Sequence, residues 1–325
     1  MIDDLVGLGK PLKKLIEVIA KGIGGLSSPI LTRKNADAKA YEIKTISEAM
    51  AESQKLLGPI VYEKAGIKIE TPLQALLPEP SPENRVLARI SYQEAKKQNN
   101  IENITRIAAD QFTEEEVISD EPVDDDWITR FFQNAENISN EMMQSLWGKI
   151  LSGEVKKPGS FSLRTMELLR NITKNEADVF SLVAKYAIHS GQHQFLFNPD
   201  NNQYLEKQCK IHFDNLLLLR DLNLLHPNND LAFVMNQVEN EDNTMIRCGS
   251  SIYLLKRPKG APKTECPIIA FTEIGKQLIQ LNEKESADAK YMQHFFQIFK
   301  EDGVTVLAGE NIPGESKIAL TSFNY

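Results

Sequence analysis

The sequence predicts a mainly α-helical protein with amphipathic helices at its N-terminus, a central helical unit and a winged-helix-like α+β domain near its C-terminus. Three observations support this fold class. Apolar residues recur at helical spacing through most of the chain, and helix-capping residues precede several of these stretches. Strand-like apolar runs lie within residues 231–271, and a further short hairpin is expected in the C-terminal tail. At 325 residues the chain is long for a single core, so two or three domains are expected.

The first strongly patterned element is a helix over residues 11–30. Pro11 suits the first helical position, and Pro29 would end the helix or kink it. Six bases against three acids give residues 1–34 a local positive charge. The apolar side chains form one continuous helical stripe, made of Leu12, Leu15, Ile16, Ile19, Ile23, Leu26 and Ile30.

This stripe has three interpretations, and the sequence leaves all of them open. It fits an ordinary core helix, an oligomer seam with a near-heptad rhythm, or an interfacial helix whose lysines attract anionic headgroups. A helix of about 20 residues would be ~30 Å long, one hydrocarbon thickness. The candidate residues for membrane contact or an oligomer seam are Leu12, Lys13, Lys14, Leu15, Ile16, Ile19, Lys21, Ile23 and Leu26.

The next segments alternate between helices and linkers. A second helix is expected over residues 37–57, a proline-rich linker over 66–82 and another helix over 83–109. Residues 110–126 then carry nine acids and no base, which accounts for the whole negative charge of the chain because the remainder sums to +1. This acidic stretch is either a solvated linker, or a docking segment or cover for a basic surface.

A compact helical unit is expected over residues 127–172. The acids before Trp127 favour a helix start there, Ser139 is a plausible N-cap for the next helix, and Gly153 is a plausible stop. The residues expected in the core are Trp127, Phe131, Leu146, Trp147 and Ile150.

The C-terminal part opens with a capping box, Thr173 to Glu176. Helices, then strands over 231–238, 245–255 and 266–271, then a helix capped by Thr272 follow the order of a winged helix. We therefore divide the chain into an N-terminal helical arm, a segment with linkers and one helix, the central unit, the winged-helix-like domain and a C-terminal helix with its tail. Their ranges are 1–65, 66–126, 127–172, 173–285 and 286–325.

No recognisable catalytic motif is present, so the chain is expected not to be an enzyme and to need no cofactor or metal. It has no GxSxG nucleophile elbow, no phosphate-binding glycine loop and no Cys–His neighbourhood. His189 and His193 have the spacing of two ligands on a helix face, but Gly191 and the lack of a nearby acid favour surface histidines. A nuclease built from the acids of residues 110–126 is the enzymatic alternative.

Basic residues near the strands are the candidates for partner binding. Four bases in eight residues, Lys256, Arg257, Lys259 and Lys263, would lie on the wing, and Arg164 lies at a helix start, where a cation is not favoured. Nucleic acid is the less favoured partner, because the chain is acidic and residues 216–219 of the would-be recognition helix are apolar.

Several motifs carry a family resemblance. The segments GLGKPLKKLIEVIAKGIG (7–24), LWGKILSGE (146–154), PGSFSLRT (158–165) and AFTEIGKQL (270–278) resemble a bacterial family of unknown function with an N-terminal amphipathic helix. The chain is also loosely similar to abortive-infection-alpha proteins. The resemblance implies a bacterial context and a role in defence against phage, and it supplies no catalytic residues.

The function expected from these features is an anti-phage effector that senses a phage component, self-assembles and acts on the inner membrane through its N-terminal helices. The expected partners are further copies of the chain, a phage protein and an anionic membrane surface. Three scattered cysteines, no signal peptide and no spanning apolar run predict a cytoplasmic protein recruited to that membrane. The alternative is a cytosolic, non-enzymatic regulator or scaffold whose winged helix binds protein or DNA.

Overall fold

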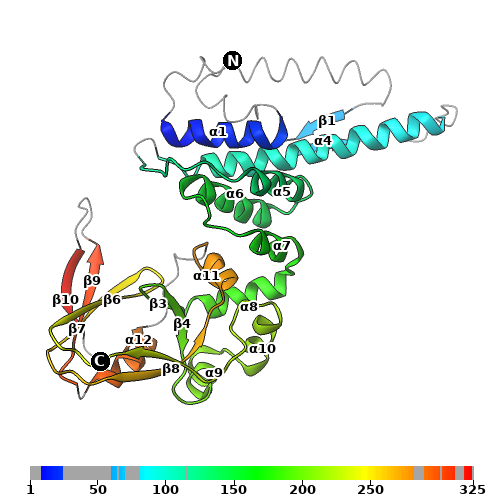
Figure 1. The fold of residues 1–325 in the computed structure, drawn as a ribbon. Helices are drawn as coiled ribbons and strands as arrows, with labels where there is room; N and C mark the ends of the chain where they lie inside the picture. Colours follow the sequence, from blue (N-terminus) through cyan, green and yellow to red (C-terminus); the bar gives the residue numbers. More distant parts are fainter. Residues whose placement is uncertain are drawn as a thin grey trace. The chain divides into compact units, whose positions relative to one another are not determined.

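The computed structural model describes residues 9–24, 60–63, 66–69, 81–113, 116–281, 289–300, 302–311 and 318–323. Their contacts divide the chain into two compact units, residues 1–161 and 162–325 (Figure 1). The helix expected over 37–57 lies outside the described residues. The five-part division proposed from the sequence stays a prediction.

The described part of the N-terminal unit is a group of packed helices with one small hairpin. Helix α4 packs along α6, and α1 packs chiefly on α5 (Figure 1). The antiparallel hairpin of β1 and β2 was not expected from the sequence. The elements are α1 (Lys10–Ile23), β1 (Ile60–Glu63), β2 (Gly66–Ile69), α4 (Pro82–Ala109), α5 (Asp125–Ala135) and α6 (Glu141–Lys156).

Side-chain caps set the starts of α5 and α6. The Asp124 carboxylate accepts a hydrogen bond from the Trp127 amide at 2.8 Å, which confirms the expected helix start. Asn140, one residue after the expected Ser139, caps α6 through the Met143 amide. Gly153 does not end α6, which continues to Lys156. Its lack of a side chain serves packing instead, because a Cβ there would lie 2.7 Å from the Phe161 ring.

Stacked aromatic rings form the core of this unit, and the sequence predicted most of them. Trp127 stacks on Phe131 with 5.0 Å between ring centroids, and Trp147 lies 5.3 Å from Phe131. These three residues and Ile150 are buried, as expected, whereas Leu146 is half-buried.

The C-terminal unit combines helices with one large antiparallel sheet. The strand order is β10-β9-β7-β6-β3-β4-β8-β5. Its helices are α7 (Leu163–Asn171), α8 (Lys174–Ala184), α9 (Gln203–Cys209), α10 (Phe213–Asp221), α11 (Glu273–Ile279), α12 (Ala289–Phe296) and the 3-10 turn η3 (Gln297–Phe299). Its strands are β3 (Ile188–Ser190), β4 (His193–Phe197), β5 (Leu231–Met235), β6 (Asp242–Cys248), β7 (Ser251–Arg257), β8 (Thr264–Ala270), β9 (Thr305–Asn311) and β10 (Ile318–Ser322).

This sheet overturns the predicted fold class, because the protein is α+β rather than mainly α with a small winged helix. The polar stretch around residue 190 is the hairpin β3–β4, which joins β6 on one side to β8 on the other. All the strands from β3 to β10 thereby become one eight-stranded sheet. The pairing of β3 with β6 joins residues about 60 positions apart, for example Ile188 with Cys248. Local sequence patterns do not reveal such long-range pairs.

Local capping signals in this unit were predicted correctly. The capping box of Thr173 and Glu176 opens α8, and Thr272 caps α11 through the Gly275 amide. The expected strand over 245–255 is instead the hairpin β6–β7, which turns at Gly249 with a φ of 55°.

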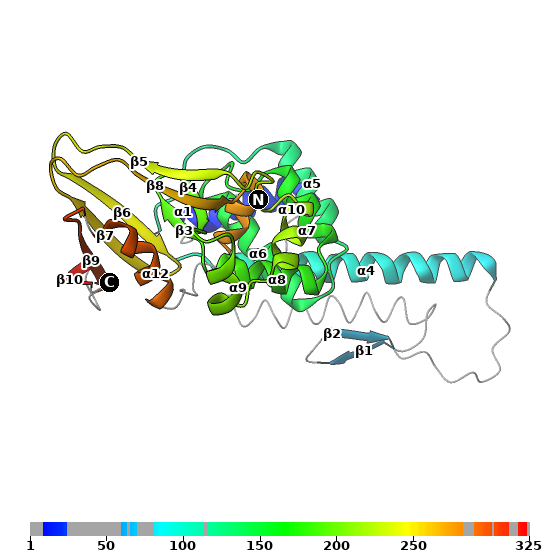
Figure 2. The ribbon, with the colours of Figure 1, turned by 90° about the horizontal axis from the view of Figure 1, so that it is seen from below.

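Aromatic side chains join α12 to the sheet. Phe295 lies 5.3 Å from Phe197 on β4, and Phe296 lies 5.2 Å from Tyr253 on β7, measured between ring centroids. Figure 2 shows α12 lying against the sheet. The buried Tyr291 hydroxyl accepts a hydrogen bond from the Phe197 amide at 2.8 Å, and burial raises its pKa well above the usual value. These contacts cover one face of the sheet near its centre.

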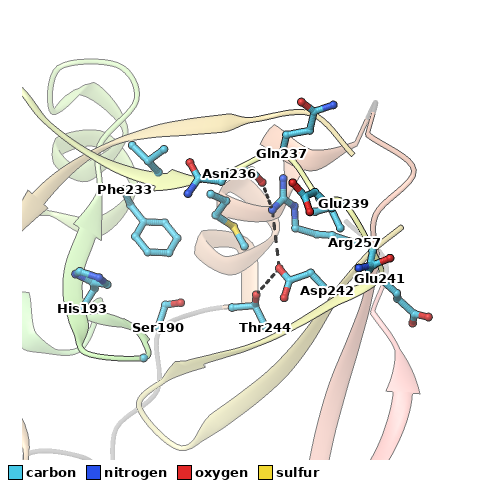
Figure 3. Close-up of a pocket in the computed structure, with 15 residues that line it drawn as sticks. Ser190, His193, Phe233, Asn236, Gln237, Glu239, Glu241, Asp242, Thr244 and Arg257 are labelled. Atoms are coloured by element: carbon cyan, nitrogen blue, oxygen red, sulfur yellow. Dashed lines mark hydrogen bonds and ion pairs between the residues drawn. The ribbon is translucent and has the colours of Figure 1, made fainter. Parts of the chain in front are cut away.

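The sheet curls and leaves a cleft of about 510 Å³ between β5 and β6 (Figure 3). Three strands separate β5 from β6 in the sheet order, yet both line the same cleft. The turn of the β3–β4 hairpin, with Ser190 and His193, borders the cleft as well.

Candidate functional site at helix α1

Helix α1 is shorter than the sequence predicted. It has 14 residues and ends at Gly24, whose φ of 70° gives it the left-handed conformation of a helix C-cap. At 1.5 Å per residue the helix is about 21 Å long. Within the described residues, no helix is long and apolar enough to cross a membrane.

The apolar side of α1 is buried in the N-terminal unit. Leu15, Ile16, Val18 and Ile19 are each at most 5% exposed, and the helix contacts α5, α6 and α4. We call the surface of α4, α5 and α6 that α1 packs on the seat of α1. The C-terminal end of α1 fits this seat closely, because a Cβ on Gly22 would lie 2.0 Å from a ring carbon of Phe132. In this structure the stripe is therefore packed as a core helix.

The basic side of α1 meets the acidic segment, defined here as residues 116–126. Lys10 pairs with Asp120, and Lys21 pairs with Asp125 at 3.0 Å. Between them, the Lys14 ammonium donates to the Ser119 carbonyl oxygen at 2.9 Å. A groove of about 350 Å³ separates the helix from the segment, and the four lysines that line it are Lys10, Lys13, Lys14 and Lys21.

These contacts shift two pKa values in the directions expected for a partly buried amine and a paired acid. Partial burial lowers the pKa of Lys14, and the nearby Asp120 carboxylate opposes that shift. The hydrogen bond and the charge of Lys10 lower the pKa of Asp120. The basic face of α1 therefore lies against carboxylates of the acidic segment.

The described part of the acidic segment is held against the helical body. Ile118 and Val123 are buried, and the Ser119 amide donates to the Lys156 carbonyl at 2.9 Å. The Lys156 ammonium also pairs with Glu116 at 2.9 Å. The interpretation of this segment as a cover for a basic surface fits these contacts better than that of a solvated linker.

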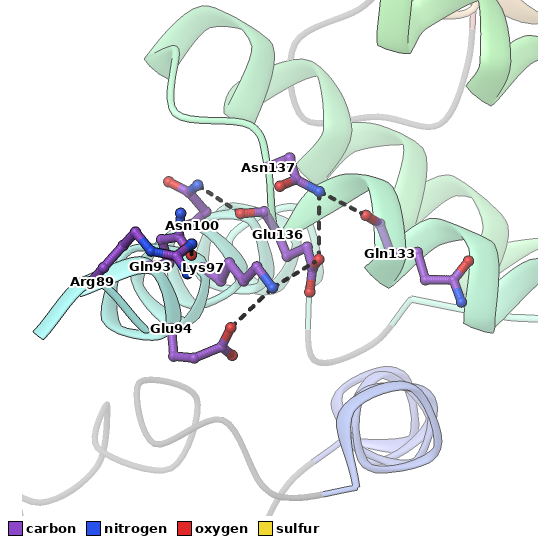
Figure 4. A network of polar contacts seen from close by, with 8 residues as sticks. All are labelled: Arg89, Gln93, Glu94, Lys97, Asn100, Gln133, Glu136 and Asn137. Atoms are coloured by element: carbon purple, nitrogen blue, oxygen red, sulfur yellow. Dashed lines mark hydrogen bonds and ion pairs between the residues drawn. The ribbon is translucent and has the colours of Figure 1, made fainter. Parts of the chain in front are cut away.

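A buried polar network fixes the junction of α4 with the turn between α5 and α6 (Figure 4). The Asn100 side chain donates to the Glu136 carbonyl at 2.8 Å, and Gln144 donates to Asn100 at 3.1 Å. At the surface, Lys97 bridges Glu94 and Glu136. Because α4, α5 and α6 all contact α1, this network stabilises the seat on which α1 rests.

Comparison with known proteins identifies the family. A family model described as "Protein of unknown function (DUF2806)" matches residues 84–296, more than half of the chain. The chain belongs to this family. No curated protein matches it, and no solved structure matches it.

Most of the residues predicted for membrane contact or an oligomer seam lie on α1, some on its buried apolar side and some on its exposed basic side. Lys13 and Lys21 are exposed, and Leu12, Lys14 and Ile23 are half-buried. Leu26 lies outside the described residues. Lys10 was not among the predicted residues, because it lies just before the apolar stripe. The contact of Gly22 with Phe132 was not predicted either, because only the fold brings these two residues together.

The predicted partner-binding bases do not form one surface. Arg257 is 2% exposed and donates to the carbonyls of Asn236 and Pro262 at 2.9 and 2.6 Å. Lys256 is half-buried, Lys259 is exposed, and Lys263 pairs with Glu265. Arg164 is exposed at the start of α7. The wing interpretation fails because Arg257 ends a sheet strand and is buried there.

His189 and His193 lie on two neighbouring strands and not on one face of a helix. His189 lies on β3 opposite Gln194, one residue after His193 on β4. Burial and the neighbouring Arg247 lower the pKa of His189 to about 4. Within the part of the chain that the structure describes, no group of three or more His, Cys, Asp or Glu residues could hold a metal ion.

Proposed function

We propose that this protein is a latent membrane-acting effector in bacterial defence against phage, of the abortive-infection kind. In this proposal a phage component triggers release of α1, copies of the chain assemble, and the helices enter the surface of the inner membrane. The observation that carries the proposal is the state of α1. Its apolar side is buried in a helical seat, while its four lysines line one groove under an acidic cover.

The length of α1 indicates how it would meet a membrane. A helix of about 21 Å is shorter than the ~30 Å hydrocarbon core, so it would lie in the plane of the interface. There the buried aliphatic side chains would enter the acyl boundary, and Lys10, Lys13, Lys14 and Lys21 would meet anionic headgroups. Self-assembly would concentrate several such helices at one place.

Packing, rather than charge, holds α1 in its seat. Burying Leu15, Ile16, Val18 and Ile19 stabilises the docked state by roughly 1.5–3 kcal/mol for each side chain. The ion pairs of Lys10 and Lys21 are solvent-exposed and contribute little. A trigger must therefore disturb the apolar seat, and the membrane must supply a comparable apolar environment.

The test uses a variant that disturbs the seat and leaves α1 unchanged. Ile128 is 2% exposed and lines the groove beside α1, so Ile128→Glu would place a charge in the interface. We expect this variant to bind vesicles of phosphatidylcholine and phosphatidylglycerol at a ratio of about 7:3, the anionic surface that a basic helix favours. Faster cleavage by trypsin within residues 10–23 would show that α1 is released.

Two matched controls test whether vesicle binding depends on the lysines of α1 or on the overall charge of the protein. Adding Lys13→Gln and Lys21→Gln to Ile128→Glu should weaken vesicle binding roughly 30-fold, since each lysine at an anionic surface contributes about 1 kcal/mol. Adding Lys157→Gln and Lys174→Gln, which change exposed lysines outside α1, should have little effect. A released α1 that does not bind these vesicles would contradict the proposal.

In cells, deletion of residues 1–30 should abolish toxicity during phage infection, and circular dichroism of the purified deletion variant checks how much of the remaining chain folds. Equal toxicity of the deletion would show that α1 is not the effector element.

A second candidate function is a non-enzymatic regulator or scaffold that binds another protein through the C-terminal unit. The acidic cleft between β5 and β6 favours a protein partner, and the burial of Arg257 removes one of the bases that DNA binding would use. An intact response to phage after deletion of residues 1–30 would favour this candidate.

A further inference from the structure

Strand β5 forms one end of the eight-stranded sheet, and its outer edge is open in the described structure. It pairs with β8 along Leu231–Met235, and no described strand pairs with its other side. Its sequence, Leu-Ala-Phe-Val-Met, has no charge and no proline, the usual devices by which proteins protect an edge strand. Val234 is 42% exposed. An edge of this kind is a template for another extended chain.

The open edge faces the cleft. The consecutive residues Phe233, Val234 and Met235 all line it, although neighbouring side chains of a strand point to opposite faces. Because β8 covers the opposite edge, a cleft that contacts residues on both faces of β5 reaches past its open edge, and the Phe233 ring points into it (Figure 3). Across the cleft, Asp242 and Thr244 belong to the part of β6 that extends beyond its pairing with β3.

The charge of the cleft selects among extended chains. Three carboxylates line it, those of Glu239, Glu241 and Asp242, and one guanidinium, that of Arg257. Glu239 and Glu241 are exposed, whereas Arg257 is buried. The accessible charge is therefore negative, which favours lysine or arginine side chains and disfavours nucleic acid.

Arg257 adds an independent sign that this cleft accepts a polar group. Its guanidinium donates to two backbone carbonyls and lies 3.9 Å from Asp242, but its buried Nε–H has no hydrogen-bond partner in the described structure. A buried unpaired donor is costly. A backbone carbonyl from an added strand is an acceptor of the kind that Arg257 already uses twice.

Aromatic side chains provide an apolar wall beside these charges. Phe233 stacks on the buried Phe195 with 4.8 Å between centroids, and His193 lies 5.8 Å from Phe233. A strand that enters the cleft would place alternate side chains against this wall and toward the carboxylates.

We propose that the cleft between β5 and β6 binds an extended, basic peptide segment of another protein, which adds as a strand to the open edge of β5. This goes beyond the membrane proposal and does not depend on it, because the cleft lies wholly within the C-terminal unit. Backbone hydrogen bonds to β5 would provide affinity, and the carboxylates would provide the preference for basic side chains.

The experiment uses the full chain and three octapeptide libraries with alternating residue types. The first alternates lysine or arginine with apolar residues, the second replaces the basic positions by glutamate, and the third repeats the first with N-methyl groups that remove alternate backbone donors. We expect retention of the first library alone. Glu239→Lys with Glu241→Lys should reduce that retention at least about tenfold, because two carboxylates become cations.

A matched variant tests whether the effect belongs to the cleft. Asp178→Lys with Asp221→Lys makes the same change of charge at exposed positions that do not line the cleft, and it should retain the basic library fully. Circular dichroism of both double variants checks that they fold.

Four outcomes would overturn the proposal. They are no retention of the basic library, equal retention of the N-methylated library, preference for a single-stranded oligonucleotide, and dimerisation of the chain that Val234→Lys abolishes. The last would show that a second copy, rather than a basic peptide, occupies the edge.

Discussion

Helix α1 and strand β5 are both short elements with apolar side chains, but their apolar parts are covered to different extents. The apolar side of α1 is buried on three helices, and its lysines meet acidic partners. The outer edge of β5 has no partner strand in the described structure and borders an open cleft. A helix pairs its own backbone hydrogen-bonding groups, so only the apolar side chains of α1 require burial against another surface. An edge strand needs another extended chain.

This difference suggests two separate roles. Helix α1 can leave its seat as a preformed unit, because its backbone hydrogen bonds go with it. Strand β5 can gain a partner without any rearrangement of the sheet. We therefore interpret α1 as a preformed helix that can be released, and β5 as an edge that can bind an added strand. The following variants test this contrast.

The largest expected effect is on the seat of α1. Ile19→Ala removes a side chain that is 1% exposed and should lower the free energy of unfolding of the N-terminal unit by about 2–5 kcal/mol. Hydrogen exchange of residues 10–23 should accelerate with it. Val234→Ala on β5 serves as the contrast and should cost no more than about 0.5 kcal/mol. Similar costs for both would remove the distinction.

The contact between Gly22 and Phe132 should give the next largest effect. Gly22→Ala places a methyl group against the ring and should cost about 1–3 kcal/mol through overpacking. Phe132→Leu should relieve part of that cost, so urea unfolding of the double variant should show a favourable coupling. Additive costs would mean that α1 does not rest on Phe132.

A pH effect should distinguish the C-terminal unit. The folded-state pKa of His189 is about 4, below its ordinary value of 6.5, so the unfolded chain binds the extra proton. Stability is complete above pH 6.5 and declines as the pH falls toward 4, by on the order of 1 kcal/mol, since the imidazole keeps some solvent contact. Thermal unfolding of His189→Gln should lack this component of the decline. An unchanged pH dependence would contradict the assignment.

The smallest expected effect on stability belongs to the edge of β5. Val234→Lys introduces a charge at a position that is already exposed, so the free energy of unfolding should change by less than about 0.5 kcal/mol. Binding of the basic peptide library should nevertheless fall sharply, because the lysine places positive charge beside the cleft. Unaltered binding would mean that the peptide does not use β5.

Sequence patterns predicted the local features of this protein well and the long-range ones poorly. The cap at Asp124, the capping box at Thr173 and the aromatic core around Trp127 all depend on neighbouring residues, and each was identified. The hairpin β3–β4 was missed, since its short polar strands resemble a loop until β6 and β8 pair with them. Without this hairpin, the remaining predicted strands suggested a winged helix in place of the eight-stranded sheet.

The candidate site was partly predictable for the same reason. The basic face and the apolar stripe of α1 follow from helical periodicity, and the acidic segment follows from its composition. Their pairing joins residues about a hundred positions apart, as in Lys21 with Asp125, and needs the fold. The cleft at β5 could not be predicted, because an edge strand is defined by the strands that fail to pair with it.

A reversible lock on α1 tests the central claim most directly. Lys21→Cys and Asp125→Cys, introduced together with Ile128→Glu, can be joined by a cross-linker that contains a disulfide, because the three native cysteines are buried. We predict that the cross-linked protein does not bind anionic vesicles and that reduction restores binding. Equal binding of the cross-linked and reduced forms would contradict the claim that α1 is a stored membrane helix.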